Sequence, residues 1–169
     1  NAAPYQMNPA ATKHRKGPKS TPAVAGGRVF TLGISGILSA HDAATGKVAW
    51  RKEFSKQFSE TSPLYGAAMS PVVEGGMVIA HLGADSSGAL MAFDAATGAV
   101  RWTWKEDGPG YASPVIATLG GKRQVITETA SNIVSVNAAD GKLLWRLPFT
   151  TPYAQNSVTP VVYGDKVIL

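Results

Sequence analysis

The chain has 169 residues, of which 44% are hydrophobic and 16% are charged, a balance typical of a folded globular domain. It has no cysteine, which excludes disulfides, thiolate metal sites and cysteine nucleophiles, and no run of roughly 18 apolar residues that could form a transmembrane segment. The formal net charge is +5.

Residues 1–20 form a basic N-terminal segment, which we expect to be partly disordered or packed on the rest of the chain. Four cations lie close together in it, at Lys13, Arg15, Lys16 and Lys19. The rest of the chain carries 12 basic and 11 acidic residues, so its charges nearly balance. Nucleic acid is therefore not expected as a partner, since a basic surface would rest on this one short segment.

From residue 21 onward the sequence repeats. Three segments, 40–50, 92–102 and 135–145, align without gaps and end in Gly-x-x-x-Trp. A second marker, Ser/Thr-Pro, precedes each of them and also occurs a fourth time, and a turn containing glycine follows each marker. The four markers are Thr21-Pro22, Ser70-Pro71, Ser113-Pro114 and Thr159-Pro160. Two markers in register at intervals of 43 to 52 residues indicate repeated structural units.

Each unit reads as four short strands. In the second unit these are predicted at 71–73, 77–82, 89–94 and 99–105, with β-branched and apolar runs separated by Gly, Asp or Ser. Four antiparallel strands recurring at this interval are typical of a β-propeller blade. We predict an all-β protein made of propeller blades at 21–54, 70–105, 113–149 and 159–169, about 3.5 blades in total. A β-sandwich is the main alternative, but it does not require near-identical turns in successive hairpins.

The repeated segment, called the cassette below, has a physical reason for each fixed residue. Its Asp or Asn can accept hydrogen bonds from the turn amides, its Gly can adopt the positive φ that the turn needs, and its Trp is large enough to fill the space between neighbouring sheets. The predicted structural docking residues are Asp42, Gly46, Trp50, Asp94, Gly98, Trp102, Asn137, Gly141 and Trp145.

The pattern Ala-x-Asp-x-x-Thr-Gly-x-x-x-Trp, preceded by Ser/Thr-Pro and a Gly-Gly turn, resembles the tryptophan-docking repeat of quinoprotein (PQQ-like) β-propellers. The third cassette departs from it mildly at Ser135, Asn137 and Asp140. WD-repeat and kelch propellers are less similar. The resemblance implies a periplasmic or extracytoplasmic location and a ring of 7–8 blades, so the chain is expected to pair with the remaining blades of a longer protein or with another copy.

The resemblance implies one of two functions. Some members are PQQ-dependent alcohol or sugar dehydrogenases that hold the quinone with calcium, and others are non-catalytic scaffolds that bind proteins. PQQ and calcium therefore stay open as cofactors of the full-length protein. The adjacent-cysteine disulfide of many such dehydrogenases is impossible here, and Trp104 is the only tryptophan outside the cassettes. We favour a non-catalytic binding scaffold; the alternatives are a dehydrogenase fragment and a small-molecule sensor domain.

With the blade order of this family, the loops that lead into the first strand of each unit share one face with the loops between its second and third strands. A tyrosine in each of the leading loops favours a protein or carbohydrate ligand there. Asp85, Glu128 and Asn132 are the only group resembling a calcium set, but lone loop acids are more often solvated, and no metal or catalytic residue is predicted. The candidate ligand-face residues are Glu60, Tyr65, Asp85, Tyr111, Glu128, Asn132, Tyr153, Gln155 and Asn156.

Overall fold

The computed structural model describes residues 9–13 and 17–169. Two cations of the basic segment, Arg15 and Lys16, lie outside the described residues. The described part of this basic segment includes a short helix, α1 (Pro9–Thr12), in which Ala11 is buried. Nearby, Lys19 Nζ donates to the carbonyl oxygen of Tyr65 at 2.6 Å. Among the described residues, no helix is long and apolar enough to cross a membrane.

The rest of the described chain is built from antiparallel sheets of consecutive strands, which confirms the prediction of an all-β fold with four-stranded propeller blades. Blade one contains β1 (Ala23–Ala25), β2 (Arg28–Leu32), β3 (Leu38–Asp42) and β4 (Val48–Lys52). Blade two contains β5 (Val72–Glu74), β6 (Met77–Ala84), β7 (Ser87–Asp94) and β8 (Val100–Trp104). Blade three contains β9 (Val115–Leu119), β10 (Lys122–Glu128), β11 (Asn132–Asn137) and β12 (Leu143–Pro148).

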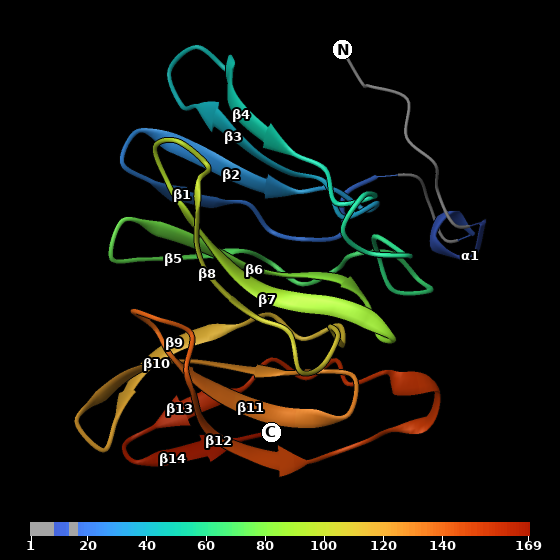
Figure 1. Cartoon of the computed structure of the whole chain (residues 1–169), viewed down its shortest axis with the longest axis vertical. Coiled ribbons are helices and arrows are strands. Elements are labelled where there is room, and N and C mark those ends of the chain that lie inside the picture. The colour runs from blue at the N-terminus through green and yellow to red at the C-terminus, as the bar shows by residue number, and fades with distance from the viewer. Residues whose placement is uncertain (1–8, 14–16) are drawn as a thin grey trace.

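A two-stranded hairpin of β13 (Val161–Tyr163) and β14 (Lys166–Ile168) follows the third blade, after a 3-10 turn, η1 (Pro152–Ala154). The sheets lie one after another along the molecule (Figure 1). First strands of successive blades are neighbours, β1 beside β5 and β5 beside β9, as they are where blades converge on an axis. The cassette turns point to the opposite end of the molecule from η1 (Figure 1).

The second hairpin of blade two is longer than the sequence pattern predicts. Strand β6 continues past residue 82, and strand β7 begins before residue 89. Only Asp85 and Ser86 therefore remain in the turn. Gly83 and Gly88 are paired across this extension. A Cβ at Gly83 would lie 2.3 Å from the backbone oxygen of Ser87, so the close approach of the two strands requires glycine. The sequence pattern predicts both glycines in the connection between the strands, whereas the structure places them within the strands.

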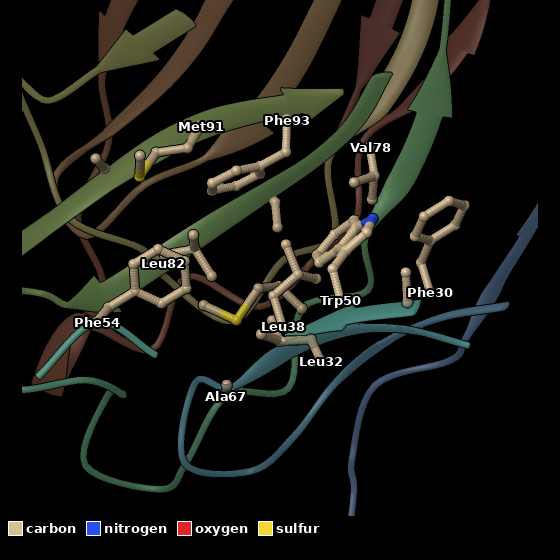
Figure 2. Packing of buried hydrophobic residues seen from close by; sticks show 14 of the residues in the cluster. Phe30, Leu32, Leu38, Trp50, Phe54, Ala67, Val78, Leu82, Met91 and Phe93 are labelled. Carbon is tan, nitrogen blue, oxygen red and sulfur yellow. The ribbon is translucent and has the colours of Figure 1, made fainter. Parts of the chain in front are cut away.

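The apolar core lies between blades. Phe30, Leu38 and Trp50 of blade one pack with Val78 and Phe93 of blade two, and all are at least nine-tenths buried (Figure 2). A second cluster joins blades two and three and contains both Trp102 and Trp104. A smaller cluster joins blade three to β13 and β14. Blades two and three therefore have apolar side chains on both faces, which is why their inner strands read as near-continuous apolar runs.

Candidate functional site

The cassettes make the same contact between blades twice. Trp50 Nε1 donates to the carbonyl oxygen of Ala95 at 3.1 Å, and Trp102 Nε1 donates to that of Ala138 at 3.1 Å. Each acceptor directly follows the Asp or Asn of the next cassette, and each indole lies against the glycine of that cassette. Trp145 differs, because its N–H donates to Gln124 Oε1 of its own blade at 3.2 Å.

The cassette turns are held by the acidic or amide side chain at their start. Asp42 Oδ1 accepts hydrogen bonds from the Thr45 hydroxyl and backbone N–H, and these bonds hold the pKa of Asp42 below its ordinary value. Asp94 Oδ1 is bonded in the same way by Thr97, and Asn137 Oδ1 accepts from the amide of Ala139. Each of these side chains therefore holds the turn in which it lies.

The Ser/Thr-Pro markers form a second repeated contact between blades. The backbone N–H of Thr21 donates to Ser70 Oγ at 2.9 Å, that of Ser70 to Ser113 Oγ at 2.9 Å, and that of Ser113 to Thr159 Oγ1 at 3.2 Å. This hydroxyl ladder runs in one direction through all four units. The proline in each marker keeps the preceding Ser or Thr extended, which lets that residue donate to the blade ahead and accept from the blade behind.

The candidate ligand residues lie around what we call the loop face, formed by the connections 53–71, 105–114 and 149–160 together with the β6–β7 and β10–β11 turns (Figure 1, on the right). The structure brings Asp85, Tyr111 and Tyr153 together around one open pocket of about 380 Å³. Tyr65 lies beside it, with its ring centre 6.2 Å from that of Tyr111 and its backbone N–H donating to the Tyr111 hydroxyl at 3.2 Å.

Two candidates prove to be buried and cannot contact a ligand from solvent. Asn156 is 1% exposed: its Nδ2 donates to the carbonyl oxygens of Thr129 and Phe149, and its Oδ1 accepts from Thr151. It ties the 149–160 loop to blade three. Glu128 is also 1% exposed, because it belongs to β10 and not to a loop as expected.

The remaining candidates are on the surface but do not gather into a site. Glu60 and Gln155 are exposed and do not line the pocket. Asn132 is part of a turn network, because its Nδ2 donates to Asp107 Oδ2 at 2.7 Å. Asp107 Oδ2 also accepts from the Thr129 hydroxyl at 2.5 Å, and thereby fixes the β10–β11 turn.

Sequence reasoning missed a relationship between His81 and Glu128. The strand registers pair Met77 with Asp94 and Gln124 with Asn137, so His81 and Glu128 occupy the same position in blades two and three. Both are 1% exposed. Blade one has Leu32 at this position, and only the register reveals the equivalence.

Both side chains are poorly solvated. His81 Nε2 lies 3.3 Å from the carbonyl oxygen of Asp107, while its Nδ1 has no partner among the described residues. Burial lowers the pKa of His81 to about 4. Neither carboxylate oxygen of Glu128 is hydrogen-bonded within the described chain, and burial raises its pKa, although the nearby Val158 amide partly offsets this.

The residues described here do not fit calcium or a quinone. Asp85 is exposed at the loop face, Glu128 is buried between strands, and the Asn132 amide is engaged by Asp107, so the three do not form one ligand set. Over the described ranges, no group of three His, Cys, Asp or Glu residues is placed to hold a metal ion. Trp104 is 5% exposed in the core between blades two and three, where its ring cannot cover a cofactor.

Comparison with known proteins gives consistent results. A family model described as outer membrane protein assembly factor BamB matches residues 6–169. The chain is 26% identical over 151 residues to BamB of Yersinia pestis, covering 87% of this chain and 37% of that protein. It is 28% identical over 127 residues to BamB of Shewanella oneidensis, covering 74% and 31%. The chain thus spans about a third of the length of these curated relatives.

Solved structures share the fold. BamB from Moraxella catarrhalis superposes with a TM-score of 0.58 at 19% identity, covering 85% of this chain and 37% of that one. Quinohemoprotein alcohol dehydrogenase from Comamonas testosteroni superposes with a TM-score of 0.63 at 22% identity, covering 82% and 28%. Identities this low show a shared architecture, so likeness to an enzyme and to an assembly factor of the same fold does not choose between their functions.

Proposed function

The chain belongs to the outer membrane protein assembly factor BamB family, and we propose that it is part of a non-catalytic propeller scaffold in outer membrane protein assembly. In this proposal the scaffold works outside the cytoplasm, in the periplasm, and binds a protein partner through its loop face. The curated relatives support an assembly role, since both of those compared above are outer membrane protein assembly factors.

The observation that carries the proposal is the character of the loop face. Leu64 is 51% exposed, Tyr65 37% and Tyr153 86%, and Leu64 and Tyr153 both line the open pocket. Exposed aromatic and apolar side chains around a hollow are typical of protein interaction sites. Among the described residues the acids and histidines of this end are buried, bound within turns or scattered, an arrangement suited to binding and not to proton transfer.

A complementation experiment tests the assembly role. The full-length protein would be expressed in a bacterium that lacks its own BamB, and the amounts of folded outer membrane proteins would be measured. We expect the wild type to restore these amounts and the double variant Leu64→Ser/Tyr153→Ser to restore them poorly. Failure of the wild type to restore them would contradict the assembly role.

A matched control separates loss of binding from loss of folding. Val48 and Val100 are 58% and 55% exposed at the cassette-turn end, so Val48→Ser/Val100→Ser removes similar apolar surface away from the loop face. We expect this control to behave as wild type. Reduction of a dye by alcohols after addition of PQQ and calcium would show catalysis and overturn the scaffold proposal.

A further inference from the structure

The pocket on the loop face has apolar walls and a single charged group. Its walls come from Pro63, Leu64, Pro109 and Ala154 together with the rings of Tyr111 and Tyr153, and its charge comes from Asp85. These residues belong to three loops and one hairpin turn, which are distant in sequence. Mostly apolar pockets with one or two polar groups select ligands by the chemistry of those groups.

Asp85 is the acid that lines this pocket, and no described residue pairs with its side chain. Two other acids line an adjoining pocket that Asp85 also borders, but both are engaged. Glu106 pairs with Arg146 Nη1 at 3.2 Å, and Asp107 accepts three hydrogen bonds in the β10–β11 turn. Asp85, by contrast, makes no hydrogen bond or ion pair with any residue that the structure describes, and its side chain is exposed in the two-residue β6–β7 turn.

The ring of Tyr111 and the backbone of Tyr153 are held in place without a ligand. Tyr111 is fixed by the hydrogen bond from the backbone N–H of Tyr65 and by contact between the two rings. Burial raises the pKa of the Tyr111 hydroxyl, and the nearby charge of Asp85 contributes to the same shift. Tyr153 has a φ of 61° and Ala154 one of 51°, in the left-handed region that costs an ordinary residue about 1–2 kcal/mol. Buried Asn156 holds the loop that imposes this conformation.

This combination points to a cation carried on an apolar stem. Aromatic faces attract cations, and a carboxylate at the rim supplies the opposite charge. Arginine fits better than lysine, because its planar, weakly hydrated guanidinium stacks on aromatic rings and pairs with a carboxylate through two parallel hydrogen bonds. Its methylene stem would lie along the proline and leucine walls.

Resting on the proposed protein-binding function, we propose that the Asp85–Tyr111–Tyr153 pocket receives an arginine side chain of the partner protein. The guanidinium lies between the two rings and pairs with Asp85. The pocket thereby selects partners that present an exposed arginine to the loop face.

The test uses the full-length protein and a blocked pentapeptide, acetyl-Gly-Ser-Arg-Ser-Gly-amide, compared with the same peptide containing citrulline, which has the same shape without the charge. Binding is followed by NMR chemical-shift changes of the backbone amides. We expect the arginine peptide to shift the amides around Asp85 and Tyr111, and the citrulline peptide to bind at least tenfold more weakly. Asp85→Asn and Tyr153→Ser should each weaken arginine binding by about tenfold.

Matched controls come from an exposed tyrosine and acid at the other end of the molecule. Tyr163 is 76% exposed and Asp165 is exposed in the β13–β14 turn, so Tyr163→Ser and Asp165→Asn should leave binding unchanged. Equal binding of the two peptides, or equal losses in the controls, would overturn the proposal. Binding of tetramethylammonium but not of the arginine peptide would instead assign a small quaternary ammonium ligand and also overturn it.

The two proposals can fail separately. Arginine binding without complementation would refute the assembly role while supporting the chemistry of the pocket. Complementation without arginine binding would refute the pocket while leaving the assembly role in place.

Discussion

The indole of Trp50 lies so close to the α-carbon of Gly98 that a Cβ there would come within 2.8 Å of the ring atom Cδ2. The contact joins the outer strand of one blade to the cassette turn of the next, and it recurs between Trp102 and Gly141. Glycine in the cassette therefore serves two needs, positive φ in the turn and room for the neighbouring indole.

Replacement of these glycines separates the two needs. Gly46 and Gly98 have nearly the same φ, 71° and 72°, but a Cβ at Gly46 would meet no atom within 4 Å. We expect Gly98→Ala to lower the free energy of unfolding by about 1–3 kcal/mol more than Gly46→Ala, since only the first displaces an indole. Urea denaturation of both variants measures the difference. Equal losses would mean that the indole moves aside without cost.

The hydroxyl ladder predicts that the side chain of Ser113 stabilises the contact between blades two and three. Ser113→Ala removes the acceptor of the Ser70 amide, and we expect a loss of about 1 kcal/mol in the free energy of unfolding. Ser113→Thr is the control, because threonine occupies the same ladder position at residues 21 and 159. Thermal denaturation should place the threonine variant near wild type. A threonine variant as unstable as the alanine variant would rule out the hydrogen bond as the cause.

Features set by a few neighbouring residues could be predicted from the sequence, whereas features that depend on contacts between distant segments could not. The cassette turns were predictable, because one Asp or Asn and one Gly specify a turn within five residues. The convergence of Asp85, Tyr111 and Tyr153 was predicted only as a shared face, since the pocket depends on loop lengths and on a left-handed Tyr153. Asn156 looked like a surface polar residue, because its partners lie on elements distant in sequence or across its own loop.

His81 should make stability depend on pH. Burial lowers the pKa of His81 from its ordinary value of 6.5 to about 4 in the folded protein. The carbonyl and the charge of Asp107 offset this shift only in part. The unfolded chain therefore binds more protons between these values, so the stabilisation is complete above pH 6.5 and is lost as the pH falls toward 4. The loss should approach about 3 kcal/mol.

The variant His81→Leu tests this, because leucine occupies the equivalent position in blade one. We expect the free energy of unfolding of this variant to fall less than that of wild type between pH 7 and pH 4.5, as measured by urea denaturation at each pH. His41→Leu is the control, since His41 is only partly buried. An unchanged pH profile in His81→Leu would mean that another group causes the acid sensitivity.

Glu128 should act with the opposite sign. Burial raises its pKa above the ordinary 4.5, so the folded chain holds a proton that the unfolded chain has already released. Stability is therefore unaffected by this group at low pH and falls as the pH rises from 4.5 through the raised pKa. Glu128→Gln removes the charge but keeps the shape, and at pH 7 it should be more stable than wild type by about 1–3 kcal/mol, because a carboxylate costs more to bury than a neutral amide. Urea denaturation at pH 4 and pH 7 should show the gain only at the higher pH, while exposed Glu60→Gln should show none. A destabilised Glu128→Gln at both pH values would instead mean that the carboxylate has a cationic partner in the full-length protein.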